Sequence, residues 1–466
     1  MKKIVLYSIT ITISFILFSC EKYLDINQNP NAGSEPPING LLANTTYRTS
    51  DNVFNTSNIT SYYAQYLASP NANSAADIYD FLNADDTYES YYDVMTDLFD
   101  MKKFAAEKGL TAYIGVADVL MALHINMASN LWGDIPYSEA FLGVDNLYPK
   151  LDNQEALMDT CLNLLNTGIA LLESPDAEDQ LDEASDFIHA GSASAWVKTA
   201  HALKARMLNQ LSKTSGYNAT DILNELSKSY TGNGDDAQIT AFEVRNPWCS
   251  VALDNEGLNL DGFLSTHFVD AANGNTFGLL DPRLPLITDK TKYGDYRGTI
   301  NGKGRIGSGI DHEECYLVSN KWYSSENSPL LVITYAETKF IEAEAYFRSG
   351  EKLKAYNAYL AGIKANMDKM GVAASDAYIN DPIVSVGADN ITLQLIMKEK
   401  YIACFLSPVT WDDLRRTDYE YTDFTLPVGA MLSTFIRRMN YPNNETSRNG
   451  DNIPDVQLTD HLWWDQ

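Results

Sequence analysis

Apolar residues recur with a helical period along most of this chain, and this pattern constrains the fold more than any other feature. In residues 88–99, and again in residues 113–131, apolar or aromatic side chains fall at positions i, i+3, i+4 and i+7. That spacing places them on one face of an α-helix. Further helices are predicted at about 40–68, 154–173, 193–212, 219–229, 334–349, 352–370 and 389–406. We therefore predict a mainly α-helical fold.

The predicted helices also pair. Glycines that can end a helix follow three of them, at Gly109, Gly350 and Gly371. Residues 343–363 read AEAYFRSGEKLKAYNAYLAGI and resemble a tetratricopeptide repeat, in which small residues let two helices approach and an aromatic residue fills the groove. Weaker versions of the pattern occur at 113–173 and 193–229. We expect several such helical hairpins to stack on one another.

Residues 231–333 differ from the rest of the chain. They show no helical period, and 12 of the 27 glycines lie between Gly232 and Gly309. Long segments of this kind are usually functional or disordered, and a high density of aromatic residues argues against disorder. The aromatic residues are Trp248, Phe263, Phe268, Phe277, Tyr293, Tyr296, Trp322 and Tyr323. We predict an irregular, loop-rich region that carries a ligand site.

The first residues have the pattern of an export signal. Residues 4–18 carry no charge and follow two lysines, and 15 helical residues rise only about 22 Å, which is short for a membrane span. The sequence LFSC at 17–20 resembles the lipobox of bacterial lipoproteins. In that interpretation residues 1–19 are a signal peptide, and Cys20 becomes the N-terminus and carries acyl chains such as palmitate, which anchor the protein stably. The alternative is a plain signal peptide with a chance cysteine.

Charge and cysteine content narrow the classes of partner. The chain has 34 Lys and Arg against 62 Asp and Glu, and loss of residues 1–19 removes two lysines, so the mature balance is 32 minus 62, or −30. A net charge this negative excludes a basic surface that binds nucleic acid. It also means that any attachment to a membrane must come from the acyl chains on Cys20. The remaining cysteines form no CxxC pair, and scattered cysteines of this kind are usually small buried hydrophobic residues. A disulfide is nevertheless allowed in an exported protein. They are Cys161, Cys249, Cys315 and Cys404.

Seven short motifs, in order along the chain, resemble those of the SusD/RagB family of nutrient-binding outer-membrane lipoproteins, in particular its subgroup with a GDIPYSEA motif. They are LDINQNPNA at 24–32, LWGDIPYSEAF at 131–141, LDPRLP at 280–285, FIEAEAYF at 340–347, WDDLRRT at 411–417, IRRMNYPNNE at 436–445 and LWWDQ at 462–466. The resemblance therefore covers essentially all of residues 20–466, as one domain.

The resemblance implies tetratricopeptide-like helical hairpins packed against irregular segments that carry the ligand site. Members of the family face the extracellular side of the outer membrane beside a SusC-like TonB-dependent transporter. They capture an oligosaccharide or, in some branches, a peptide, and they are not enzymes and need no cofactor. Three alternatives to oligosaccharide capture stay open at this point: a peptide-capturing lid of the same family, a secreted glycoside hydrolase, and a tetratricopeptide scaffold that binds only protein.

A search of the sequence for catalytic and metal-binding motifs finds none complete. HEECY at 312–316 lacks the second histidine of a zinc motif, and GSASA at 191–195 lacks the last glycine of a nucleophile elbow. GKGRIG at 302–307 matches a dinucleotide-binding glycine pattern, but no helical pattern follows it. DNEGLNLDG at 254–262 lacks the spacing of a calcium loop. We predict no catalytic residue, metal or cofactor, although 62 acids supply carboxylate pairs by chance, which keeps the hydrolase open.

Aromatic rings are the candidate ligand contacts. A flat ring covers the apolar C–H face of a sugar while nearby polar groups bond its hydroxyls. Trp322, Trp248 and Tyr296 lie in the irregular region, and Tyr79 lies between the first two predicted helices with Asp77 as a polar neighbour. Each of these residues can instead belong to the core. The remaining tryptophans are expected to be structural, because they lie in helices or packing motifs; they are Trp132, Trp196, Trp411, Trp463 and Trp464.

Overall fold

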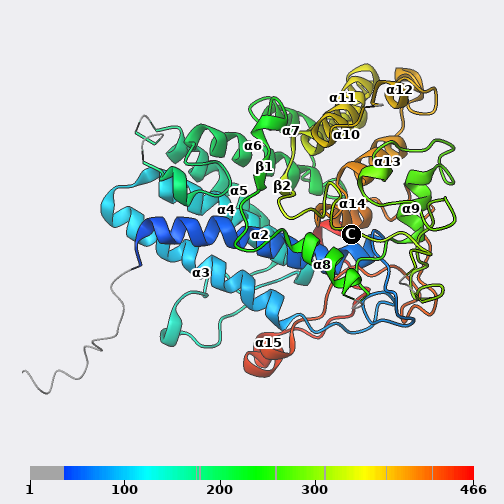
Figure 1. Ribbon diagram of the computed structural model, residues 1–466. Coiled ribbons are helices and arrows are strands. Elements are labelled where there is room, and N and C mark those ends of the chain that lie inside the picture. The colour runs from blue at the N-terminus through cyan, green and yellow to red at the C-terminus, as the bar shows by residue number, and fades with distance from the viewer. Residues whose placement is uncertain are drawn as a thin grey trace, which may run out of the picture.

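Helices form most of the molecule (Figure 1). The computed structural model describes residues 36–466 apart from 175, 178–179, 258–259, 309–310, 374 and 422. The helices within this part are α2 (Ile38–Tyr63), α3 (Asp85–Lys108), α4 (Thr111–Trp132), α5 (Gln154–Leu172), α6 (Ala193–Gln210), α7 (Ala219–Leu226), α8 (Pro247–Glu256), α9 (Thr266–Asn273), α10 (Tyr335–Arg348), α11 (Lys352–Met370), α12 (Ser375–Ile379), α13 (Leu393–Ala403), α14 (Val409–Arg416) and α15 (Asn443–Arg448). The mainly α-helical prediction is confirmed. The predicted signal peptide and Cys20 lie outside the described residues.

The helices pair closely where a glycine on one helix faces a larger side chain on the other. In the hairpin of α4 and α5, a Cβ added at Gly115 would lie 2.6 Å from Leu172 of α5, so only glycine permits this approach. In the hairpin of α10 and α11, the ring of Phe340 packs directly on Gly362, where a Cβ would lie 2.9 Å from the ring. Small residues therefore admit a neighbouring helix or ring, as the tetratricopeptide-like pattern predicted.

Helix ends agree with the sequence signals in most places. Gly109 and Gly371 adopt left-handed conformations, with φ of 69° and 72°, directly after α3 and α11. The helix predicted at about 40–68 ends earlier, at Tyr63. The physical reason is tertiary: Gln65 has a φ of 52°, and the backbone N–H of Ala68 bonds the carbonyl of Phe263 instead of continuing the helix.

The segment 231–333 is not wholly irregular, which corrects the prediction that it lacks helices. It contains α8, α9 and two short antiparallel strands, β1 (Ala237–Ile239) and β2 (Leu330–Ile333). Asn246 caps α8 and Pro247 occupies its first position, while Ser265 caps α9. Both helices have ten or fewer residues, too few for a clear apolar period. Loops that follow α9 lie near α9 and α13 on the right of Figure 1.

Helix α4 is the most hydrophobic element of the core. It is long and apolar enough to cross a membrane, but 89% of its most apolar window is buried inside the protein, as expected of a core helix. The described cysteines are also buried and form no disulfide; they are Cys161, Cys249, Cys315 and Cys404.

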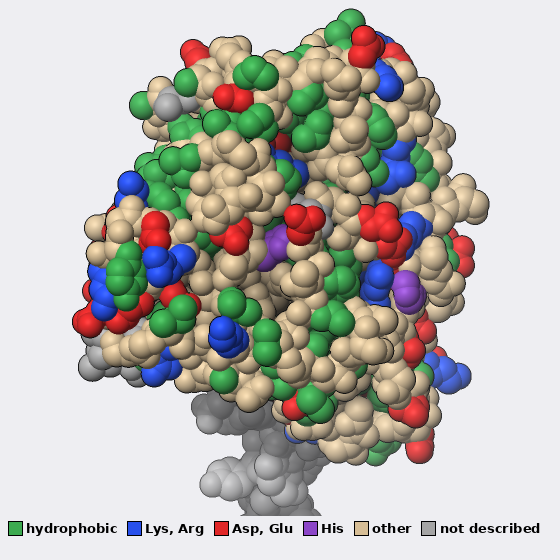
Figure 2. Space-filling model, turned by 90° about the vertical axis from the view of Figure 1, so that its right-hand side faces the viewer, with side chains coloured by type: hydrophobic (Ala, Val, Ile, Leu, Met, Phe, Trp, Pro, Cys, Tyr) green, Lys and Arg blue, Asp and Glu red, His purple; other side chains and the backbone are tan. Residues whose placement is uncertain are grey.

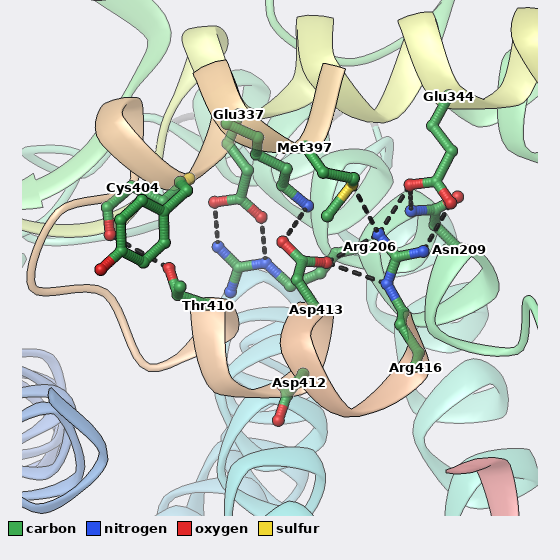
Figure 3. Close-up of polar contacts among 12 residues, drawn as sticks. Arg206, Asn209, Glu337, Glu344, Met397, Cys404, Thr410, Asp412, Asp413 and Arg416 are labelled. Atoms are coloured by element: carbon green, nitrogen blue, oxygen red, sulfur yellow. Dashed lines mark hydrogen bonds and ion pairs between the residues drawn. The ribbon is translucent and has the colours of Figure 1, made fainter. Parts of the chain in front are cut away.

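A buried network of ion pairs joins α6, α10, α13 and α14 (Figure 3). The guanidinium of Arg416 donates to both carboxylate oxygens of Glu344, at 2.5 and 2.6 Å, and to Asp413 at 2.7 Å. Arg206 bonds Glu337 with two hydrogen bonds of 2.6 Å. Burial alone would raise the pKa of Glu344, but the charge and hydrogen bonds of Arg416 outweigh it and hold that pKa well below its usual range. The network therefore ties the helical hairpins to the C-terminal part of the chain.

Candidate functional site

Three adjoining cavities, here called the groove, lie on the face that carries α9 and α13. The first cavity, of about 410 Å³, lies between the ends of α6 and α10, the start of α13 and residues 416–421. The second, of about 370 Å³, lies between residues 276–277, α13 and residues 420, 421 and 423. The third, of about 340 Å³, is lined by the first turn of α9 and by residues 300–301 and 423–428.

Shared side chains join the cavities into one continuous surface. Thr392, Gln394 and Tyr421 line both the first and the second cavity. Thr276 and Asp423 line both the second and the third. Figure 2 looks onto this face, which is hollowed near its centre and bordered by acidic side chains.

Most of the groove lining is polar. Its uncharged members, which can donate and accept hydrogen bonds, include Gln65, Thr266, Thr276, Asn301, Thr392, Gln394 and Thr425. The exposed apolar residues Ile300, Leu426 and Val428 complete the third cavity. This mixture of hydroxyls, amides and small apolar patches suits a neutral ligand that itself carries both hydroxyls and C–H faces.

Aromatic rings also face the groove. The imidazole of His267 stacks on the ring of Phe424, with ring centroids 3.8 Å apart. Burial lowers the pKa of His267 to about 3, so the imidazole is neutral at physiological pH. The ammonium of Lys398 lies 4.5 Å from the centroid of the Phe277 ring in the second cavity. Flat neutral rings therefore accompany the polar groups.

Asp77, one of the predicted contacts, lies behind the wall of the third cavity and does not line it. It is fully buried and accepts hydrogen bonds from the Asn301 side chain and from the backbone N–H groups of Gly302 and Ser69. Burial raises the pKa of Asp77 to about 6, although these hydrogen bonds lower it. In this structure Asp77 positions Asn301, which does line the groove.

Close backbone contacts explain the glycines of the GKGRIG segment. A Cβ at Gly302 would lie 2.0 Å from the carbonyl oxygen of Val428, and one at Gly304 would lie 2.6 Å from the backbone nitrogen of Ala72. Both glycines have positive φ, of 82° and 78°. The segment therefore packs between two other loops and supports the third cavity. Among the described residues that follow it, no helix of the dinucleotide-binding arrangement occurs before β2.

Two of the predicted aromatic contacts are packed inside the protein. Tyr79 is fully buried, and its ring packs edge-on against Tyr63 with centroids 6.0 Å apart. Trp248, in α8, is 3% exposed and packs edge-on against Phe54 at 4.8 Å. Both rings fill core space in this structure and neither lines the groove.

The other two predicted aromatic residues, Trp322 and Tyr296, are half-buried. Trp322 packs against Tyr323, with centroids 4.6 Å apart. The backbone carbonyl of Tyr296 accepts a hydrogen bond from Asn273, at the end of α9. Neither ring lines the groove, but both keep exposed surface, and Tyr296 is attached to the helix whose first turn forms the third cavity.

Sequence reasoning missed Tyr421 and His267. Tyr421 belongs to the stretch DYEYTDFTL directly after α14, whose aromatic density could have singled it out. His267 follows the cap of α9, a helix that was not predicted. Among the described residues, no group of three or more His, Cys, Asp or Glu side chains is arranged to hold a metal ion.

Comparisons with known proteins agree on one family. Residues 30–442 match the SusD-like family, described as starch-binding and associating with the outer membrane. A SusD/RagB family protein from Bacteroides thetaiotaomicron has a similar structure, with a TM-score of 0.74, 20% identity, and coverage of 92% of this chain and 99% of that one. A chitin-binding SusD homologue from Flavobacterium johnsoniae has a TM-score of 0.77, 19% identity, and coverage of 91% and 98%. Comparison with curated proteins gave no significant match.

The family match extends over most of the chain, and the solved structures share its fold over nearly their whole length. The family match also agrees with the seven sequence motifs and with the helical hairpins. The chain therefore belongs to the SusD-like family of nutrient-binding proteins associated with the outer membrane.

Proposed function

We propose that this protein captures an oligosaccharide at the cell surface and delivers it intact to a SusC-like TonB-dependent transporter. The observation that supports the proposal is the groove, a continuous surface of hydroxyl, amide and carboxylate groups with neutral aromatic rings. A sugar chain presents hydroxyls to such polar groups and C–H faces to such rings. The description of the family as starch-binding supports a glycan rather than a peptide.

The experiment for this proposal combines a binding assay and a product assay. The purified protein is titrated with a panel of oligosaccharides and a panel of peptides, and each bound sugar is recovered and chromatographed. We expect saturable binding of at least one oligosaccharide and its recovery at full length. Binding of peptides alone would favour the peptide-capturing alternative. Steady formation of shorter sugars, at a rate proportional to the protein, would favour the glycoside hydrolase.

The proposed anchor is a lipid on Cys20, which places the protein on the outer membrane facing the extracellular side. Because the acyl chains attach through the cysteine sulfur, we expect Cys20→Ala to remain unlipidated and to leave the membrane fraction. Mass spectrometry of the N-terminus and fractionation of cells measure the two effects. An unmodified N-terminus on the wild-type protein, cleaved at another residue, would contradict the lipoprotein assignment.

Trp322 remains a proposed ligand contact outside the groove. If its exposed ring stacks on a sugar, Trp322→Ala should lower affinity by about five- to 150-fold, which corresponds to about 1–3 kcal/mol by analogy with stacked bases. Calorimetric binding and thermal unfolding on the same sample test this. Unchanged affinity with a large fall in melting temperature would instead make Trp322 a packing residue.

A further inference from the structure

Two side chains that line the groove carry a buried hydroxyl with no hydrogen-bond partner among the described residues. The first is the phenol of Tyr421, a side chain that is 5% exposed and lines both the first and the second cavity. Its ring is held edge-on against Phe424, with centroids 5.7 Å apart. Burial raises the pKa of Tyr421 well above its usual value, so the hydroxyl stays protonated and can both donate and accept.

The second hydroxyl belongs to Thr266, in the first turn of α9, and lines the third cavity. The cap of this helix is Ser265, whose side chain accepts from the backbone N–H of His267, so Thr266 does not serve as the cap. Buried hydroxyls are normally bonded, and an unpartnered one in a cavity wall indicates a group supplied from outside the protein. The two hydroxyls lie in different cavities of the same groove.

The charges around the groove select against an acidic ligand. Each cation that lines the first cavity has a carboxylate partner: Arg416 pairs with Glu344 and Asp413, Lys213 with Asp418 at 2.7 Å, and Arg348 with Glu344 at 2.8 Å. Carboxylates that pair with no cation among the described residues lie at the other end, where Asp423 is exposed and lines both the second and third cavities. An anionic sugar would meet repulsion there and find no unengaged cation among the described lining residues of the first cavity.

We propose that the groove holds one extended, neutral oligosaccharide that is long enough to span more than one of the three cavities, and whose hydroxyls bond Tyr421 near one end and Thr266 near the other. This inference rests on the proposed function, because it assumes that a sugar is the ligand. It adds a minimum length, a charge and two contact residues. A chain that fills only one cavity would leave one of the two hydroxyls unpaired.

The test removes each hydroxyl separately without changing side-chain shape. Calorimetry measures the affinity of the wild type, Tyr421→Phe and Thr266→Val for malto- and chito-oligosaccharides of two to six units. We expect the affinity of the wild type to rise with chain length. Each variant should weaken the longest bound sugar by about two- to tenfold, the usual range for one hydrogen bond. Oligogalacturonides of equal length should bind at least about tenfold more weakly.

Tyr217→Phe is the matched control. The hydroxyl of Tyr217 is also buried with no hydrogen-bond partner among the described residues, but Tyr217 lines none of the three cavities. We expect this variant to bind like the wild type, and Tyr421→Phe to keep the melting temperature of the wild type. If a sugar binds but only one variant or neither weakens it, the extended site is wrong and the proposed function stands. A marked fall in melting temperature in Tyr421→Phe would also overturn the inference. If no sugar binds, both proposals fail.

Discussion

Replacing Glu344 by alanine is expected to lower the free energy of unfolding by about 3–5 kcal/mol, because it leaves a buried cation without its partner. Glu344 is fully buried and accepts hydrogen bonds from Arg416, from Arg348 at 2.8 Å and from Asn209 at 3.0 Å. After the change, the guanidinium of Arg416, a side chain that is only 3% exposed, keeps only Asp413 as a charged partner among the described residues. Urea unfolding followed by circular dichroism measures the difference.

Glu342 is the matched control, since it lies on the same helix two residues earlier and pairs with Lys339 at 2.6 Å. Both side chains of this pair keep solvent contact, with 22% exposure for Glu342 and 25% for Lys339. Glu342→Ala should therefore lower the free energy of unfolding by only about 0–1 kcal/mol. Equal losses in the two variants would show that the buried network does not carry the stability assigned to it.

The second large effect is expected for Gly302→Ala, which acts on the groove as well as on stability. The new Cβ would lie 2.0 Å from the carbonyl oxygen of Val428, in a backbone conformation with a φ of 82°. We expect a loss of about 2–5 kcal/mol from backbone strain and overpacking together. Because Val428 and Asn301 line the third cavity, the displacement should also weaken sugar binding by more than about tenfold.

Gly294→Ala separates the steric effect from the backbone effect. Gly294 has nearly the same φ, 83°, but nothing lies within 4 Å of an added Cβ. Its substitution should cost about 1–2 kcal/mol and leave sugar binding unchanged. If Gly302→Ala matches it in both stability and affinity, the contact with Val428 does not shape the groove.

Most of the fold could be predicted from the sequence, because long helices repeat an apolar period many times. The predicted helices at 154–173 and 352–370 correspond to Gln154–Leu172 and Lys352–Met370. Short helices escaped this reasoning. α8 has ten residues and almost no apolar period, although Asn246 and Pro247 before it are a start signal that could have found it.

The groove could not be predicted, because it joins segments that are far apart in the chain. Thr266, Gln394 and Tyr421 have no common motif, and only the packing of α9 against α13 and the following loop brings their cavities together. The density of aromatic residues identified candidate rings, but composition does not distinguish a buried ring such as that of Tyr79 from one with exposed surface such as that of Trp322. That distinction depends on tertiary packing, which the sequence pattern does not report.

The central claim is that the groove captures an oligosaccharide. A crystal structure of the protein soaked with the sugar that binds best in the panel tests this most directly. We expect sugar rings along the groove, with hydroxyls bonded to Tyr421 and Thr266 and unbroken linkages between the units. Sugar bound only outside the three cavities, with the groove empty at saturating concentration, would contradict the claim.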